Sequence, residues 1–545
     1  MRSVAVWGGI ICAVSVAAGS AQAEQPTIEV LMKKIDALQR RLDEVEGRER
    51  AAKSTARLAA KPAAAAPYKS AAAPAAPANA NPVAIAALPP STVAAQQATA
   101  NSIPGLLAPE PMGSQFEDAL RSDLPGLSLR IPGTASEVRV YGFAKASGYT
   151  DLNGRNQNNA PAVSGIPLKG SPADLQGGDT GMTARFSRIG LDTRTLTSMG
   201  TLETRVEGDF GGGPAASNNM VFRLRQAWGE LGTDSFRVLV GQANSLWNEG
   251  MYETLNDSTN LNQSFVRQAQ VRLTGRLAPG WTGMISLEAP ETQAVSANGF
   301  FNPENNFNGG ASPAFNALPD LLGRVNYRYE GLEFDTRGLV RDLNIRAAGT
   351  ALAPAFTQNK NTVGWGVASH VRFPMRWLSG SFGADQFIAM AYYGQGIGRY
   401  FAGNSGGQDL LTNIGLPSAT LDFAQDALPT YGGTVAYRRF WAPELRSNFA
   451  YSYAKQDYPS YALQFTPASA QALALNGEMQ QAIANLIWSP YATARNGTVD
   501  TGWLDVGLEY IYSKRNVFGG AAATGTAGEG YGVANRITAA AVVRF

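Results

Sequence analysis

The chain has 545 residues, of which 16% are charged and 44% hydrophobic, and 59 are glycine. Soluble globular proteins carry about 25% charged residues, so this composition is untypical of a soluble multidomain protein. The formal net charge of +2 is too balanced for a protein that binds nucleic acid mainly by neutralising phosphates. One histidine and one cysteine exclude most metal and thiol chemistry, and we expect no metal, no cofactor and no enzyme active site.

The first residues are typical of a secretory signal peptide. Arg2 supplies a short positive region, and residues 4–18 form an apolar stretch too short to span a bilayer as a helix. Ala-Gln-Ala at residues 21–23 matches the small-residue cleavage pattern. We therefore predict a signal peptide over residues 1–23. The only cysteine, Cys12, lies within it, so the mature chain would contain no cysteine.

A short heptad pattern and a low-complexity segment follow. Apolar residues recur at alternating spacings of three and four, at Ile28, Leu31, Ile35, Leu38, Leu42 and Val45. This spacing predicts a periplasmic coiled coil over residues 24–50, although an amphipathic helix packed on its own protein is the alternative. The pattern does not specify the oligomeric state. Residues 51–136 then form an Ala/Pro-rich linker and lead-in, and the Ala/Pro-rich part, residues 51–112, cannot bury enough apolar area to fold.

From residue 137 onward, apolar and polar residues alternate as they do in β-strands. Leu504, Val506, Leu508 and Tyr510 alternate with Asp505, Gly507 and Glu509, and a similar alternation occurs at 202–210 and 325–330. The polar positions are unusually charged, and the apolar positions are rich in Tyr and Phe. This pattern is typical of a barrel with lipid outside and water inside, so we predict an all-β transmembrane barrel over residues 137–545.

We predict sixteen antiparallel strands in this barrel. Their ranges are 138–150, 183–195, 200–210, 220–231, 235–242, 264–276, 280–289, 321–330, 333–343, 363–374, 382–394, 430–440, 445–455, 480–488, 501–513 and 534–545. Long loops follow most odd-numbered strands and short turns follow most even-numbered ones, as in outer-membrane barrels, where short turns are periplasmic and long loops outer. Eighteen strands are the alternative, because segment 395–429 has room for another hairpin.

Short motifs occur in a characteristic order along this region. They are IPGT at 131–134, VYGFAK at 140–145, VEGDF at 206–210, GQ at 241–242 and GLEY at 507–510, and the terminal strand ends at Phe545. This order resembles the DcaP-like family of trimeric outer-membrane porins, whose periplasmic extension the heptads and linker also resemble. The resemblance implies a 16-stranded homotrimeric channel in the outer membrane of a Gram-negative bacterium. It also implies small, often anionic solutes such as dicarboxylates, and it marks Phe545 as the signal for the barrel assembly machinery.

Arginine dominates the positive charge of the predicted barrel, with 27 Arg and 5 Lys against 32 acidic residues. Arg binds carboxylates bidentately and stays charged, so this bias favours anionic solutes. By alternation we expect eleven arginines to line the pore, namely Arg188, Arg194, Arg205, Arg223, Arg225, Arg272, Arg324, Arg328, Arg337, Arg341 and Arg438. An outward Arg at the bilayer midplane would cost about 2–4 kcal/mol. The alternative is that arginines brace the wall in ion pairs, which we expect for about half of them.

The loop at 243–263 is the strongest candidate for a constriction. The third outer loop of porins generally folds into the lumen, and this loop carries Glu249, Glu253 and Asp257 at spacings of four. That spacing would place the three carboxylates on one helical face, across the pore from the arginines. A solvated outer loop is the alternative. A calcium site has little support, because calcium loops prefer ligands at alternate positions.

The single histidine does not indicate an enzyme. A hydrolase would need a serine beside His370, but the adjacent Ser369 lies on the opposite face of a strand. We therefore predict a porin for small hydrophilic solutes, in contact with outer-membrane lipid. The alternative is a barrel that anchors a periplasmic structural or adhesive coiled coil.

Overall fold

The computed structural model describes the chain from residue 126 onward. The described residues are 126–156, 161–213, 220–248, 252–257, 260–301, 313–347, 358–401, 408–417, 423–495 and 497–545. The predicted signal peptide and coiled coil and most of the predicted linker lie outside these residues.

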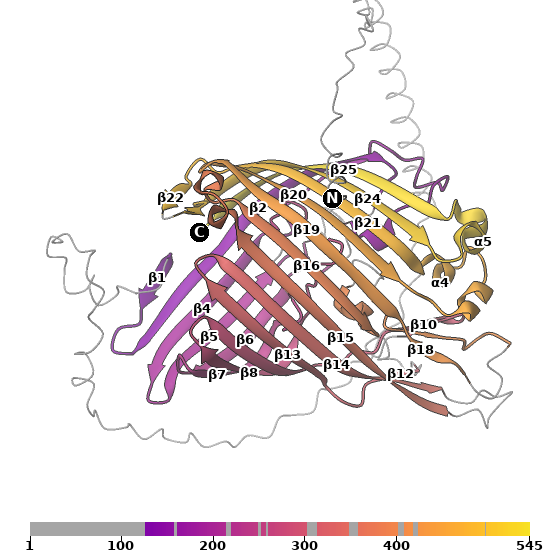
Figure 1. Cartoon of the computed structure of the whole chain (residues 1–545), viewed down its shortest axis with the longest axis horizontal. Helices are drawn as coiled ribbons and strands as arrows, with labels where there is room; N and C mark the ends of the chain where they lie inside the picture. Colours follow the sequence, from indigo (N-terminus) through magenta and orange to yellow (C-terminus); the bar gives the residue numbers. More distant parts are fainter. Residues whose placement is uncertain are drawn as a thin grey trace, which may run out of the picture. The chain divides into compact units, whose positions relative to one another are not determined.

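Sixteen antiparallel strands form a closed barrel. Figure 1 shows these strands side by side in the barrel wall. In barrel order they are β2 (Ser136–Asn153), β4 (Arg188–Thr197), β5 (Gly200–Asp209), β6 (Arg223–Gly232), β7 (Phe236–Asn244), β8 (Arg267–Ala278), β9 (Trp281–Glu288), β13 (Asp320–Tyr329), β14 (Leu332–Ala347), β15 (Gln358–Pro374), β16 (Gln386–Gln395), β19 (Pro429–Ala442), β20 (Leu445–Gln456), β21 (Asn476–Trp488), β24 (Leu504–Val517) and β25 (Tyr531–Arg544). The barrel closes because β2 pairs with β25 along one edge and with β4 along the other.

All sixteen predicted strands are confirmed, and the alternative of eighteen is wrong. Among its described residues, the segment between β16 and β19 adds only the strands β17 (Leu410–Thr412) and β18 (Gln425–Ala427). These two strands pair with β10 (Ala294–Ser296) and β11 (Gly299–Phe301) in a separate four-stranded sheet. The segment is long because it forms part of this small sheet, and it adds no hairpin to the barrel wall.

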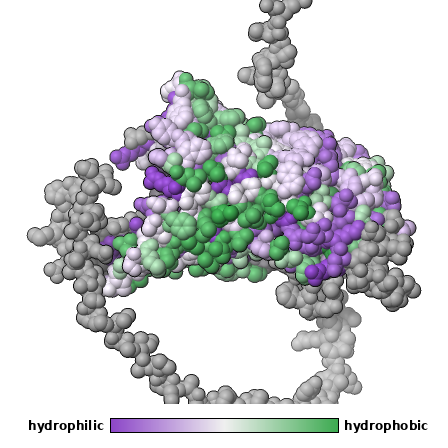
Figure 2. Space-filling view, turned by 60° about the horizontal axis from the view of Figure 1, so that its bottom comes forward, coloured by the Kyte–Doolittle hydropathy of each residue, from purple (hydrophilic) through white to green (hydrophobic). Residues whose placement is uncertain are grey.

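The alternation of side chains along each strand separates an apolar outer face from a polar inner face. On β24, Val506 and Leu508 are 40% and 58% exposed, whereas Asp505 and Glu509 are 2% and 1% exposed. Figure 2 shows hydrophobic residues gathered in a band on the surface, with hydrophilic residues on either side of it. This is the arrangement that a barrel in a lipid bilayer requires.

The links between strands alternate in length. Short turns join β4 to β5, β6 to β7, β8 to β9, β13 to β14 and β19 to β20, and long segments follow β2, β7, β9, β16 and β20. The turn between β8 and β9 depends on Gly280, whose φ of 78° a residue with a side chain rarely adopts. The short turns therefore define one rim of the barrel and the long loops the other.

The two ends of the barrel sequence meet at the short-turn rim. The backbone N–H of Phe545 donates to the carbonyl of Gly142, and the N–H of Gly142 donates to the carbonyl of Phe545, both at 3.1 Å. On the N-terminal side of this contact, β1 (Leu127–Arg130) replaces β25 as the partner of β2 and pairs with residues 137–140. Strand β1 thus lies in the segment that we assigned to the lead-in.

None of the helices in the described residues is long and apolar enough to cross a membrane.

Candidate functional site

The loop between β7 and β8 packs against the inside of the barrel wall. Trp247 is fully buried and its ring lies 5.9 Å from those of Tyr400 and Phe401. Arg324 of β13 donates to the carbonyl of Asn248 at 2.8 Å, so the loop is held where it leaves β7. An apolar cluster formed by Leu246, Trp247 and Tyr252 with inward side chains of the wall fixes its path. The loop is therefore not a solvated outer loop over these residues.

Further along, the loop reaches β24, on the other side of the barrel from β7. The carboxylate of Glu509 accepts hydrogen bonds from the N–H of Leu255 at 2.8 Å and from the N–H of Asn256 at 3.0 Å. It also accepts from the hydroxyl of Thr254 at 2.7 Å and from the amide of Asn485 at 3.1 Å. One buried carboxylate thus binds two consecutive main-chain amides of the loop, and such charge-assisted hydrogen bonds are strong.

Glu253 is held by an arginine of the wall. Arg446 of β20 donates to both of its carboxylate oxygens, at 2.7 and 2.6 Å, and Arg438 lies 3.8 Å away. Arg446 also donates to Asp505 at 3.0 Å. Although burial acts in the opposite direction, the hydrogen bonds from Arg446 lower the pKa of Glu253. Glu253 therefore stays ionised.

Asp257 forms the next attachment, to β2. Lys145 donates to the Asp257 carboxylate at 2.6 Å and to the carbonyl of Leu255 at 2.7 Å. Burial raises the pKa of Asp257, and the charges of Lys145 and Arg188 only partly offset this effect. Asp257 thus takes up a proton at a higher pH than an ordinary aspartate does.

The predicted helical face is wrong for the described part of the loop. Residues 252–257 are not helical, so Glu253 and Asp257 do not share a helical face and instead bind different strands. The reason is that wall side chains satisfy the backbone amides of the loop, which leaves fewer for a helix. Glu249 lies outside the described residues.

Four arginines gather at the long-loop end of β4, β6 and β8. We call Arg188, Arg223, Arg225 and Arg267 the arginine cluster. The charges of Arg225, Arg223 and Arg188 all act on Arg267, which has no ion pair among the described residues. The acids within the cluster are Asp209, which binds Arg223 at 2.8 Å and also pairs with Arg225, and Glu207, which lies 3.4 Å from Arg188. Among the described residues, the four arginines therefore form ion pairs with only two carboxylates, although the charge of Asp257 also acts on Arg188.

A β-bulge helps to build this cluster. The pairing of β5 with β6 shifts between Glu207 and Gly208, so that Gln226 lies opposite Glu207 and Leu224 opposite Gly208. The extra residue, Arg225, therefore points to the same side as Gln226, and both contact Glu207. A regular strand would have placed these adjacent side chains on opposite faces.

Nine of the eleven arginines predicted to line the pore form ion pairs, more than the half that we expected. Outside the cluster, Arg205 pairs with Asp192, Arg324 and Arg337 with Asp335, Arg328 with Glu333, Arg341 with Asp320 and Asp409, and Arg438 with Glu253. The excess arises because alternation places acids on the same face as the arginines. Arg194 and Arg272 have no ion pair within the described part of the chain.

His370 is a wall residue. It is 2% exposed, and its Nδ1 lies 3.4 Å from Asp335, beside Arg324 and Arg337. Ser369 instead shares a hydrogen bond with Thr336 at an exposed position, so the two side chains face opposite sides as predicted. The described residues contain no group of His, Cys, Asp and Glu that could hold a metal ion.

Several residues that shape this interior were not predicted. Arg267 is an odd number of residues from the inward Arg272, so strict alternation assigns it to the outer face. It is the first residue of β8, directly after the loop, where the alternation does not yet apply. Alternation along their strands correctly predicts that three of these side chains point into the barrel, namely those of Lys145, Arg446 and Glu509. It gives no sign that they bind the loop, because their partners are between 110 and 255 residues away.

Comparisons with known proteins agree with this architecture. No family model matches the sequence, and no curated protein matches it. Among solved structures, the outer-membrane channel DcaP of Acinetobacter baumannii has a TM-score of 0.55 at 22% identity, over 75% of this chain and 98% of that chain. The outer-membrane-expressed OmpT of Vibrio cholerae has a TM-score of 0.42 at 12% identity, over 76% and 99%. The resemblance to DcaP-like channels is thus confirmed at the level of the fold.

Proposed function

We propose that this chain is an outer-membrane porin through which small hydrophilic solutes diffuse, with a preference for anions. The observation that carries the proposal is the closed sixteen-stranded barrel with an apolar outer face and a charged inner face. A loop attached across the interior is the kind of feature that narrows a pore and places its charges. No catalytic group is needed for this function.

The preference for anions is supported by the arginine cluster. Within the described part of the chain its four positive charges form ion pairs with only two carboxylates, and Arg267 is paired with neither of them. Strand β8 carries a further inward arginine, Arg272. Within the described residues its side chain donates hydrogen bonds only to Gln270 and to the carbonyl of Asn244. These guanidinium groups suit planar carboxylates, so dicarboxylates are the solute class that we propose.

The proposed assembly follows from the outer surface and from the ends of the chain. Outward Val506, Leu508 and Ile537 would contact outer-membrane lipid or a neighbouring subunit, and we propose a homotrimer, as the resemblance to DcaP-like channels implies. Phe545 would be recognised by the barrel assembly machinery. Residues 24–50 would extend into the periplasm as a coiled coil.

The experiment that tests the proposal is single-channel recording with purified protein in planar bilayers. A porin gives stepwise ohmic conductance and, under a salt gradient, a reversal potential that favours anions. Insertion without open conductance would contradict the proposal and favour the anchor function.

A further inference from the structure

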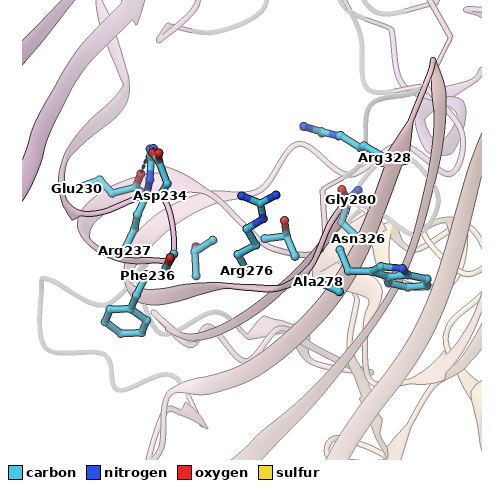
Figure 3. A pocket seen from close by; sticks show the side chains of 13 residues that line it. Glu230, Asp234, Phe236, Arg237, Arg276, Ala278, Gly280, Asn326 and Arg328 are labelled. Atoms are coloured by element: carbon cyan, nitrogen blue, oxygen red, sulfur yellow. Dashed lines mark hydrogen bonds and ion pairs between the residues drawn. The ribbon is translucent and has the colours of Figure 1, made fainter. Parts of the chain in front are cut away.

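A second group of arginines surrounds a pocket at the short-turn rim. The pocket has a volume of about 530 Å³ and lies between the ends of β6, β7, β8, β9 and β13. Arg237, Arg276 and Arg328 line it together with Glu230 and Asp234, and Figure 3 shows the Arg276 side chain between the other two arginines. This volume is within the range of about 300–1,000 Å³ that small-molecule sites occupy.

Two of these arginines already have carboxylate partners. Arg237 lies 3.2 Å from Glu230, 3.7 Å from Asp234 and 3.8 Å from Glu203, and Arg328 lies 2.7 Å from Glu333. Arg276 forms no ion pair and no side-chain hydrogen bond within the described residues. Among the described residues, Arg276 is therefore the arginine of this pocket that no carboxylate engages in an ion pair.

A buried amide in the same pocket also lacks a partner. Asn326 is 6% exposed, and its Nδ2 has no hydrogen-bond acceptor among the described residues. Leaving a buried donor unsatisfied costs about 1–3 kcal/mol, so this amide requires a further acceptor, such as water or a bound molecule. Asn326 alternates with the outward Val325 and lines the pocket, as Arg276 does.

We propose that this pocket is a binding site for the carboxylate of a small organic acid, with Arg276 and Asn326 as its donors. The guanidinium of Arg276 would bind the two carboxylate oxygens, and the amide of Asn326 would donate to one of them. Arg237 and Arg328, neutralised by their acids, shape the walls. The inference rests on the proposed function only in that the solute reaches the pocket through the lumen, and it adds a site distinct from the arginine cluster.

A cysteine placed in the pocket tests the site without measuring current. Thr282 lines the pocket, and Cys12 is the only native cysteine, so Thr282→Cys in a Cys12→Ser background gives one reactive thiol. In detergent-solubilised protein, an anionic methanethiosulfonate should react on the order of tenfold faster than a cationic one, after correction for their rates with free cysteine. Succinate should slow the reaction.

Variants of the two donors decide the assignment. Arg276→Gln should abolish both the preference for the anionic reagent and the protection by succinate, and Asn326→Leu should weaken the protection. Arg495→Gln, which removes an exposed arginine outside the pocket, should change neither. Equal rates for the two reagents, or unchanged protection in Arg276→Gln, would overturn the site. Protection by inorganic phosphate that equals or exceeds that of succinate would overturn the assignment to a carboxylate.

This experiment and the bilayer recording fail independently. A protein that shows protected labelling but no conductance would retain the site and lose the porin function. A conducting protein without protected labelling would retain the function and lose the site.

Discussion

Arg446 of the barrel wall donates two hydrogen bonds to Glu253 of the lumenal loop, at 2.7 and 2.6 Å, across 193 residues of sequence. The guanidinium is 1% exposed and also binds Asp505 and Ser489. Because both carboxylate oxygens are engaged, the pair fixes the direction of the loop as well as its position. Together with Glu509 and Lys145, Arg446 holds the loop on the wall opposite to the strand from which it departs.

Glu253→Gln should loosen this attachment. The amide keeps the shape of the side chain but can accept only one of the two hydrogen bonds, and it loses the charge. We expect a loss on the order of 1.5–3 kcal/mol in the local stability of the loop, since hydrogen bonds to charged groups are worth about that much. In single-channel records, the open current should fluctuate more than in the wild type.

The matched control is Glu529→Gln, which removes an exposed carboxylate in the link between β24 and β25. Its current noise should equal that of the wild type. Equal noise in Glu253→Gln would show that the Arg446 pair does not restrain the loop.

The pH dependence of selectivity should depend on Asp257. Burial raises the pKa of this carboxyl above the ordinary value of 3.8, so it binds a proton at a pH where free carboxylates remain ionised. As the pH falls, the site loses a negative charge, and Lys145 and Arg188 are left less compensated. Anion preference should therefore increase on mild acidification. Reversal potentials measured over a pH series check this, and Asp257→Asn should already show the higher anion preference at neutral pH.

Arg267→Gln should reduce anion preference. It removes the one charge of the arginine cluster that has no carboxylate partner among the described residues, and it leaves the pairs of Asp209 and Glu207 in place. We expect the anion-to-cation permeability ratio to fall on the order of twofold, because one charge in a water-filled pore is worth a fraction of a kcal/mol. Arg495→Gln is the control. An unchanged ratio in Arg267→Gln would assign selectivity to other residues.

Deletion of Phe545 should impair assembly. Its backbone closes the barrel by exchanging two hydrogen bonds with Gly142, and its ring is about half exposed at the rim, where another protein can contact it. We expect less folded barrel in outer-membrane fractions, measured by the heat-dependent shift in gel mobility. Phe545→Tyr, which keeps an aromatic ring, should assemble nearly normally, and normal assembly of the deletion would contradict the role of Phe545.

The wall of the barrel could be predicted because its signals are local. Alternation along each strand depends on the contrast between lipid and water. A few residues of sequence are therefore enough to predict that Val506 points outward and Asp505 inward. The order of long and short links then indicated the number of strands. Only the length of segment 395–429 pointed to eighteen strands instead of sixteen, because β17 and β18 of that segment lie outside the barrel wall.

The interior could not be predicted to the same degree, because its contacts are non-local. Nothing near Glu509 indicates that it binds the amides of Leu255 and Asn256. The spacing of Glu253 and Asp257 indicated a helix, yet their partners on β20 and β2 determine an extended path. Arg267 was missed because alternation stops being reliable where a strand begins.

The most direct test of the account is the reversal potential of the wild-type channel in a planar bilayer under a potassium chloride gradient. A barrel whose charged interior holds four arginines with two ion-paired carboxylates predicts an open, ohmic channel whose reversal potential shifts toward the chloride equilibrium potential. An inserted protein that conducts no ions, or one whose reversal potential favours potassium, would contradict it.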